Sequence, residues 1–468
     1  MSDTQTKTAT ATTGATGAET GAATVRWGDR DVPVIQSRDV VVVGGGSAGA
    51  ACGIRCAREG LSTLVVDRYS LLGGSTSNAL VCPMMPTYVD HLQILNEVEQ
   101  RLGADGTPTR DDYTTMIWFA PEQLGMVMED MLYEAGGEAL YDATLVGVVR
   151  DEATGAITHA VLAVVEGIVA VAARLFVDAS GDAALARAAG VPCDSGDDEG
   201  VNQVSSLRFT MGGVDVERYR DYVLSLDDHF SPLVDGYFFE SAMVAGRDFK
   251  LEPIFRRGVE AGILREEDLR YYQTFSIPGK PGCLALNCPH VASMRSNATA
   301  AARSAALREA HGTIRRLARF LHEMMPGFEH AYVMQVAPLI GIRESWRVRG
   351  SYVLTEDDYA RQARFPDGVV KGDWYIDVHS NKKGLFHRNT YQHGDYYEIP
   401  WRSMVCDEVP NLAVAGRCIS TTFLMQASVR IIPTVIDMGD VAGSACATSL
   451  RTGVALNALD GSQLRRFA

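Results

Sequence analysis

"VVVVGGGSAGAACGI", which runs from Val40 to Ile54, is the stretch that decides how this chain folds. The four valines predict a strand that is buried on both faces, as in a parallel sheet. Three glycines follow, a fourth stands at Gly49, and the alanine-rich piece after them reads as a helix that ends near Gly60. A strand that runs into a helix across bare backbone indicates that a ligand comes very close to the main chain.

The pattern Gly44-x-Gly46-x-x-Gly49 and the strand "STLVVDR" after the helix complete a βαβ unit. In such a unit Gly44 permits the tight turn, Gly46 lets a pyrophosphate approach the backbone, and Gly49 lets the helix pack on the strand. The unpaired N–H groups at the start of the helix attract phosphate. Asp67, twenty-one residues after Gly46, is placed to accept hydrogen bonds from a ribose and disfavours the 2′-phosphate of NADP.

The next part of the chain favours FAD over NAD. A second glycine pair stands in "LLGGSTSNAL", and a helix is predicted over "APEQLGMVMEDMLYEAGG". Three β-rich runs follow, with turns at Thr154-Gly155 and Glu166-Gly167, and the last run ends in "VDASGD". A plain NAD domain does not continue with a β-meander of this kind. No second glycine fingerprint for NAD(P)H occurs in the chain.

These segments, with "IGIRESWRVRGSYVLTEDD" and "NLAVAGRCISTTFLMQASVRIIPTVIDMGDVAGSA", resemble the FAD-dependent oxidoreductases of the glutathione-reductase-like flavoprotein class. They are most similar to relatives of the fumarate reductase and succinate dehydrogenase flavoproteins. The resemblance implies an α/β fold, with a Rossmann-like FAD-binding domain (a parallel sheet with a β-meander) and an inserted α+β substrate domain. We expect a disordered tail over residues 1–36, the FAD-binding domain over 37–204 and 400–468, and the substrate domain over 205–399.

The resemblance also implies which positions bind FAD. The first glycine motif and Asp67 lie at the pyrophosphate and the adenosine ribose, and the second glycine pair lies toward the ribitol and flavin. A helix that starts with a proline opens below the isoalloxazine ring, where its dipole stabilises the negative charge of the reduced flavin. The predicted set is Gly44, Gly46, Ser47, Ala48, Gly49, Asp67, Arg68, Gly73, Gly74, Ser75, Gly181, Asp182, Gly416, Arg417, Pro433 and Thr434.

Two clusters carry candidate catalytic groups. In "DWYIDVHS", Asp377 and His379 are two apart on a predicted strand, so both face the same way, and His379 is the candidate acid and base. In "GIRESWRVRGSY", strand alternation puts Arg343, Arg347 and Arg349 on one face. Arg343 and Arg347 are the candidate substrate anchors. The alternatives are a hydrogen-bonded core histidine and a surface strand whose arginines pair with neighbouring carboxylates.

Composition narrows the function further. The net charge of −15 argues against binding to nucleic acid or to an anionic membrane, and the first residues lack the pattern of a secretory signal. Nine scattered cysteines indicate reduced thiols in the cytoplasm, and their spacing predicts no metal site.

The sequence therefore predicts an FAD-dependent oxidoreductase, a dehydrogenase or reductase that acts on a small organic substrate by hydride transfer through flavin N5. A flavin-dependent monooxygenase and a flavin subunit that passes electrons to a redox partner protein are the alternatives. Homo-oligomerisation is also left open.

Overall fold

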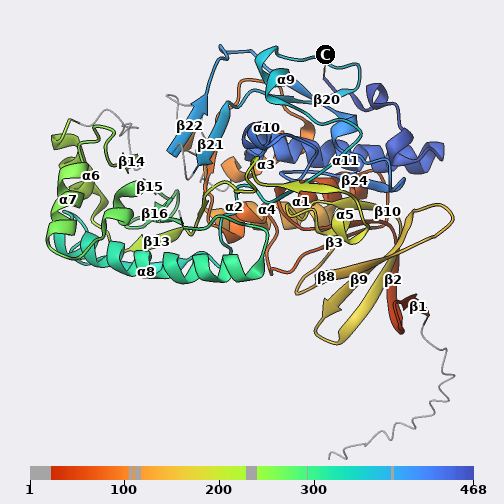
Figure 1. Ribbon diagram of the computed structural model, residues 1–468, viewed down its shortest axis with the longest axis horizontal. Helices are drawn as coiled ribbons and strands as arrows, with labels where there is room; N and C mark the ends of the chain where they lie inside the picture. The colour runs from red at the N-terminus through yellow and green to blue at the C-terminus, as the bar shows by residue number, and fades with distance from the viewer. Residues whose placement is uncertain are drawn as a thin grey trace, which may run out of the picture.

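The computed structural model describes residues 23–104, 109–110, 117–227, 240–291, 293–380 and 384–467. Two bodies of packed apolar side chains account for most of these residues. The first core draws on residues 40–191 and 348–464, and the second draws mainly on residues 207–342. The second body stands beside the first, at the left of Figure 1, and is built around a small sheet and one long helix.

The first core is built on a sheet with the strand order β7-β3-β2-β10-β9-β8, to which β24 adds beside β10. The strands β7, β3, β2, β10 and β24 are parallel, whereas β10, β9 and β8 form an antiparallel meander with turns where they are predicted. Their bounds are β2 Arg30–Val43, β3 Thr63–Val66, β7 Glu138–Leu140, β8 Thr144–Arg150, β9 Ile157–Val164, β10 Gly167–Asp178 and β24 Leu412–Val414. All four valines of residues 40–43 are buried, as expected for a central parallel strand.

Helices α1 (Ser47–Arg58) and α11 (Ile432–Thr452) pack against each other beside this sheet, although they lie at opposite ends of the chain. Small residues let them approach. A Cβ atom on Gly439 would lie 2.1 Å from the carbonyl oxygen of Ala48, and one on Gly443 would lie 2.6 Å from Cβ of Arg55. A buried ion pair joins the two helices, with 2.6 Å between Nε of Arg55 and Oδ1 of Asp440.

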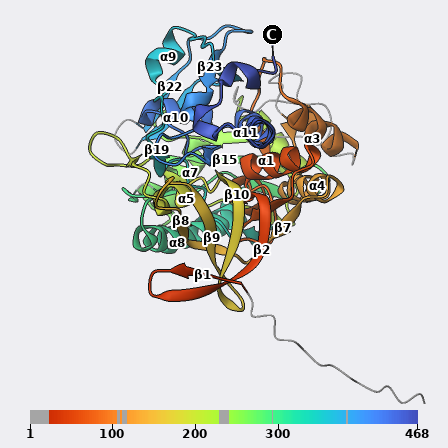
Figure 2. The same ribbon diagram turned by 90° about the vertical axis from the view of Figure 1, so that its right-hand side faces the viewer.

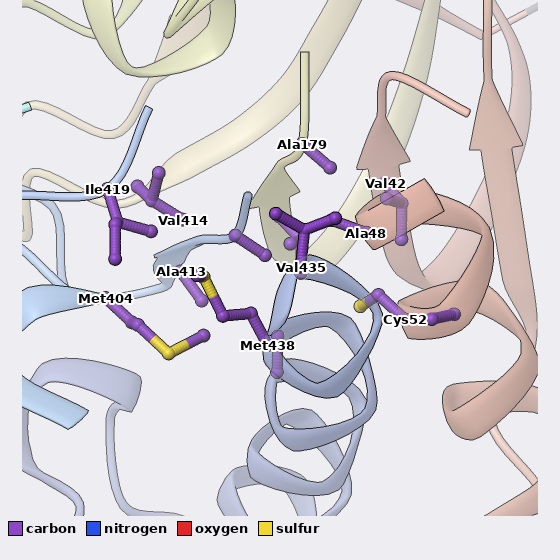
Figure 3. Packing of buried hydrophobic residues seen from close by; sticks show 14 of the residues in the cluster. Val42, Ala48, Cys52, Ala179, Met404, Ala413, Val414, Ile419, Val435 and Met438 are labelled. Atoms are coloured by element: carbon purple, nitrogen blue, oxygen red, sulfur yellow. The ribbon is translucent and has the colours of Figure 1, made fainter. Parts of the chain in front are cut away.

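Figure 3 shows the apolar part of this contact. Ala48 and Cys52 of α1 lie on the side of Val435 of α11, whereas Met438 of α11 points toward Met404 and Ala413, and all of these side chains belong to the first core. Helices α3 (Gln93–Ala104) and α4 (Pro121–Glu134) complete this layer. No helix in the described ranges combines the length and the apolar character needed to cross a bilayer.

The second body contains a five-stranded antiparallel sheet in the order β14-β15-β16-β13-β18. Helix α8 (Ala300–Met324) runs along it and ends just before Pro326-Gly327. The strands are β13 Phe209–Gly212, β14 Glu240–Met243, β15 Tyr272–Ser276, β16 Leu284–Leu286 and β18 Tyr332–Val336, and the shorter helices are α6 Val216–Ser225 and α7 Glu252–Glu260. The core of this body places Phe255 against Phe320 of α8, with 4.6 Å between ring centroids.

The remaining elements are short. The strands are β4 Pro83–Met84, β5 Thr109–Arg110, β6 Ile117–Trp118, β11 Cys193–Ser195, β12 Ser205–Ser206, β17 His290–Val291, β19 Trp346–Val348, β20 Gly368–Gly372, β21 Ile376–Ser380, β22 Gly384–Arg388 and β23 Tyr397–Pro400. The helices are α2 Ser75–Asn78, α5 Ala184–Ala188, α9 Glu356–Ala360 and α10 Phe423–Val429.

The predicted end of the inserted domain at residue 399 is wrong. The second core ends at Ile342, and the segment from β19 to β23 packs into the first core. Strand β19 pairs with β11, and β20 pairs with β23, whose side chains are fully buried against the rest of the first body. The apolar residues of this segment therefore belong to the first body and not to the second.

The predicted disordered tail over residues 1–36 is wrong from Thr24 onward, whereas residues 1–22 lie outside the described residues. Strand β1 (Thr24–Trp27) forms a hairpin with the start of β2, and Trp27 pairs with Arg30 across a two-residue turn. Gly28 takes the positive φ of 60° that this turn requires. Figure 2 shows the hairpin below the sheet. The alternating apolar residues on either side of Gly28-Asp29 are the signal that predicts it.

We expect Gly439→Ala to destabilise the fold by about 1–3 kcal/mol, because the added methyl group collides with the backbone of α1 at Ala48. Gly312→Ala is the matched control, because the nearest atom to its new Cβ is the flexible end of Arg316, at 3.5 Å. That control should be neutral or stabilise by about 0.5–1 kcal/mol. Urea unfolding measures both changes, and equal stabilities would contradict the packing of α1 on α11.

Candidate functional site

A cavity of about 530 Å³ lies where the two bodies meet. Its walls come from both glycine loops, the end of β10, the start of α11, strand β21 and the segments 206–208 and 339–343 of the second body. The carboxyl ends of β2, β3 and β10 therefore open into the same space, which is where parallel α/β sheets bind nucleotides.

The first glycine loop depends on glycine for two different reasons. Gly44 has a φ of 100°, and a Cβ there would lie 2.6 Å from the backbone of Ala179. A Cβ on Gly49 would lie 1.8 Å from the carbonyl oxygen of Gly44, so this glycine lets α1 pack on the strand. Gly46 has ordinary backbone angles, and a Cβ there would meet only Cα of Gly74, at 3.8 Å. At Gly46 the missing side chain therefore leaves room in the cavity and relieves no strain.

The second glycine loop lies directly on the first. Gly73 forms a parallel bridge with Gly46 and donates its N–H to the carbonyl of Gly45 at 2.8 Å. A Cβ on Gly74 would lie 2.7 Å from Cα of Gly46. Two bare segments and the N-terminus of α1 thus form a cradle of backbone, which fits a diphosphate held by N–H groups.

Asp67 holds the first loop in place. Its carboxylate accepts hydrogen bonds from the N–H groups of Gly45 at 2.6 Å and Tyr69 at 2.8 Å. Burial raises the pKa of Asp67 despite these two bonds. The carboxylate also lines the cavity beside Arg68, where it keeps lone pairs that could accept from a ribose. The residues present therefore fit an extended dinucleotide at this end.

Asp182 connects the two bodies at the cavity wall. It binds Arg417 at 2.9 Å and Arg303 of α8 at 2.9 Å, and Oγ of Ser345 donates to it at 2.6 Å. Burial alone would raise the pKa of Asp182, but Arg417 and Arg303 hold it well below its usual range. This carboxylate is charged at any pH of interest and ties the long helix of the second body to the first.

Most of the predicted cofactor residues lie on the cavity wall. The wall includes Gly44, Gly46, Ser47, Ala48, Asp67, Arg68, Gly73, Gly74, Ser75, Gly181, Asp182, Gly416 and Arg417. Gly49, Pro433 and Thr434 are not part of it. At the start of α11 the wall is made by Ile431, Ile432 and Val435 instead.

His379 and Asp377 lie together on β21 and both line the cavity, as their spacing predicts. The distance from Nε2 of His379 to Oδ2 of Asp377 is 3.3 Å, and the buried Nδ1 has no hydrogen-bond partner. Burial lowers the pKa of His379 to about 4, and the charge of Arg343 acts in the same direction against that of Asp377. The imidazole is therefore neutral near pH 7, with a proton on Nε2 directed to Asp377 and a bare Nδ1.

Three further side chains near His379 were not predicted from the sequence as site residues. His290 stacks on Tyr271 with 4.1 Å between ring centroids, and its ring lies 5.2 Å from that of His379. Arg208 and Arg430 line the same wall. An arginine within the apolar stretch "SSLRFTMGG" is the signal that could have identified Arg208, because a buried charge requires a partner or a ligand.

The predicted pairing of Arg343 with Arg347 as substrate anchors is wrong for Arg347. Only Arg343 lines the cavity. The guanidinium of Arg347 is buried against Glu344 and donates to the carbonyls of Thr421 and Gly196 at 3.1 Å each. Arg343 precedes the short strand β19 and does not follow its alternation, so the three arginines do not share one face. Arg349 pairs with Asp194 in solvent at 2.6 Å.

Comparison with known proteins gives one informative match. The family model described as FAD dependent oxidoreductase matches residues 39–467, which is almost the whole chain. No curated protein sequence matches significantly.

Among solved structures, a geranylgeranyl bacteriochlorophyll reductase-like protein from Thermoplasma acidophilum aligns over 92% of this chain and 82% of its own, with 13% identity and a TM-score of 0.49. A p-nitrophenol 4-monooxygenase from Pseudomonas putida aligns over 92% and 84%, with 11% identity and a TM-score of 0.48. A flavin-dependent brominase aligns over 90% and 81%, with 13% identity and a TM-score of 0.47.

We expect Gly46→Ala to keep the fold and to weaken FAD binding about tenfold or more. The backbone angles of Gly46 suit alanine, and the new methyl group would project toward the cradle. The ratio of flavin to protein absorbance and a titration of apoprotein with FAD measure the loss, and thermal melting of the apoprotein checks the fold. Gly312→Ala is the control for the substitution itself. Unchanged FAD affinity in Gly46→Ala would place the diphosphate elsewhere.

Proposed function

The chain belongs to the family of FAD-dependent oxidoreductases, and from this premise we propose that it oxidises or reduces a small organic substrate with His379 as acid and base. FAD is the cofactor, and when bound it accepts or supplies a hydride, that is, one proton with two electrons. The observation that supports the proposal is the shared cavity. The same walls that carry the glycine cradle also carry a neutral histidine with one bare ring nitrogen.

In the direction of oxidation, a proton must leave a substrate hydroxyl or amine as its carbon loses a hydride. Nδ1 of His379 is the atom that takes this proton, because Asp377 holds the proton of Nε2. Asp377 is held in turn by Arg430, whose NH2 group donates to its carbonyl at 3.0 Å. This chain of contacts keeps the imidazole in one tautomer and one orientation.

Arg343 positions the substrate next to this histidine. Its NH1 group donates to the carbonyl of Val204 at 2.7 Å, and its NH2 group lies 3.3 Å from Nε2 of His290. The guanidinium is therefore fixed at the cavity wall while other N–H donors stay available to a ligand. The walls keep bulk water from His379, whose exposed fraction is 9%, and a proton held there is less readily lost to solvent.

Two finer expectations from the sequence stay predictions. One is kinship with the fumarate reductase and succinate dehydrogenase flavoproteins. The other is the set of FAD-binding positions named above, each of which would contact the part of the cofactor that the resemblance implies.

We expect His379→Gln to slow reduction of the bound flavin by substrate about 10²- to 10⁴-fold, because proton removal loses its base. An anaerobic screen of small alcohols, amines and hydroxy acids for bleaching of the flavin first supplies the substrate. Stopped-flow absorbance then gives the rate. His311→Gln, on the exposed side of α8, is the control and should reduce at the normal rate. Equal rates in the two variants would remove His379 from the mechanism.

The pH dependence gives an independent prediction. His379 has a lowered pKa of about 4, so the base form persists as the pH falls from 7.5 to 5.5, and the rate of substrate oxidation should change little. A histidine with the ordinary pKa of about 6.5 would lose roughly tenfold over this range. The rate of flavin reduction by substrate, measured between pH 5.5 and 7.5, distinguishes these two pKa values. A tenfold fall in this rate would show that the catalytic base has an ordinary histidine pKa and is not the buried His379.

A further inference from the structure

Three arginines line the cavity on the part of its wall that carries His379, away from the two glycine loops. Arg208 lies between β12 and β13, Arg343 follows the segment 339–342, and Arg430 precedes α11. Arg430 is paired with Asp377 at 3.3 Å. Arg208 and Arg343 have no carboxylate partner in the part of the chain that the structure describes.

The contacts of Arg208 and Arg343 are with neutral groups. Arg208 donates from NH1 to the carbonyl of Leu80 at 3.2 Å, and Arg343 donates to the carbonyl of Val204 and to Oγ of Ser206. Each guanidinium has five N–H donors, so most of them stay available. An antiparallel bridge between Ser206 and Gly341 brings the two arginine-bearing segments side by side.

The environment of Arg208 and Arg343 disfavours the charged form of both guanidinium groups. Burial lowers the pKa of Arg208, and burial together with the charges of Arg430 and Arg208 lowers the pKa of Arg343 to about 9. An enclosed cation without an anion is costly, and a protein keeps one where a ligand supplies the missing charge. Two such cations on adjacent segments of one cavity wall therefore indicate a binding site for an anion.

The charge balance at this end indicates how much negative charge the ligand brings. Among the described residues of the cavity wall, Arg208, Arg343 and Arg430 stand against the carboxylates of Asp377 and Glu240, which is a surplus of one positive charge. Glu240 accepts a hydrogen bond from Gln273 at 2.6 Å. The other charged residues of the wall lie elsewhere: Asp67 and Arg68 are at the glycine loop, and Asp182 with Arg303 and Arg417 is at the joint between the two bodies. One carboxylate neutralises the surplus, whereas a phosphate dianion exceeds it.

The rest of this wall suits an apolar body. Trp374 and Tyr375 line it as a stacked pair with 4.3 Å between ring centroids, and Tyr271 lines it with its ring stacked on His290. Leu339 and Ile340 add aliphatic surface next to Arg343. Flat aromatic walls around a cationic end match a ligand that is apolar except at one acidic group.

We propose that Arg208 and Arg343 together bind the carboxylate of a substrate that carries a single negative charge on an apolar body. The inference rests on the proposed function only in placing the substrate in this cavity. Two guanidinium groups hold the carboxylate by charge-assisted hydrogen bonds, which fixes the distance of the rest of the substrate from His379. The role of Arg208 is binding, and it takes no part in proton transfer.

Binding without turnover tests the proposal. The FAD-loaded enzyme is titrated with benzoate, with its neutral isostere benzamide and with phenyl phosphate, which carries two charges. The change in flavin absorbance and the heat of binding are both recorded. Benzoate should bind about tenfold or more tightly than either of the other two, because only it supplies one planar anion to two fixed guanidinium groups.

Variants assign the site to its residues. Arg208→Met should weaken benzoate about tenfold or more and leave benzamide unchanged, and Arg208→Lys should recover part of the loss because it restores the charge. Arg349→Met is the matched control, since that arginine pairs with Asp194 in solvent away from the cavity. Flavin content and the melting temperature of each variant show whether the protein is still folded and loaded.

Several outcomes would overturn the proposal. These are equal affinity for benzoate and benzamide, tighter binding of phenyl phosphate, no detectable binding of any of the three, and equal effects of Arg208→Met and Arg349→Met. None of these results bears on proton transfer. A normal rate in His379→Gln would refute the acid and base role while leaving the benzoate measurements intact.

Discussion

The cofactor end of this molecule depends on backbone segments that approach one another more closely than side chains allow. The Gly44–Gly46 loop lies on the Gly73–Gly74 loop, and α1 packs on both the central strand and α11. A β-carbon at Gly49, Gly74 or Gly439 would lie within 2.7 Å of a backbone atom. These contacts leave backbone N–H groups and open space where the two glycine loops meet the N-terminus of α1. Such a cradle can hold a diphosphate without any charged side chain.

The second body is tied to this cradle by charge. Asp182, at the end of β10, binds one arginine from its own body and one from α8 of the other, so a single carboxylate fixes both across the cavity. Arg417 also donates to the carbonyls of Gly181 and Ile342, at 2.7 Å and 3.0 Å. Because these partners are enclosed, their attraction is screened little by salt. The polar cluster of Asp182, Arg303 and Arg417 therefore helps to fix the position of the second body relative to the first.

The two ends of the cavity differ in how they treat charge. At the cradle, backbone dipoles attract phosphate and the carboxylates present are already bonded. At the far end, Arg208, Arg343 and Arg430 outnumber the carboxylates of Asp377 and Glu240 among the described residues of the wall. Burial is the main cause of the low pKa of His379, and the charge of Arg343 acts in the same direction. The same arginine is one of the two that we propose to bind the substrate anion, so the charge that binds the substrate also disfavours protonation of the base.

The sequence by itself determined the βαβ unit, the meander, the start of α11 and the cavity wall around the two glycine loops, because each depends on local signals: apolar runs, glycine spacing and turn residues. The pair Asp377 and His379 could also be predicted, since strand alternation places residues two apart on one face. Only the tertiary structure decided which arginines reach the cavity. Arg347 is held by Glu344, while Arg208, well over a hundred residues from Arg343, comes beside it through the bridge of Ser206 to Gly341. The second core likewise ends at Ile342 because the later strands bury their side chains against the first body, and such long-range choices between partners leave no periodic signal in the chain.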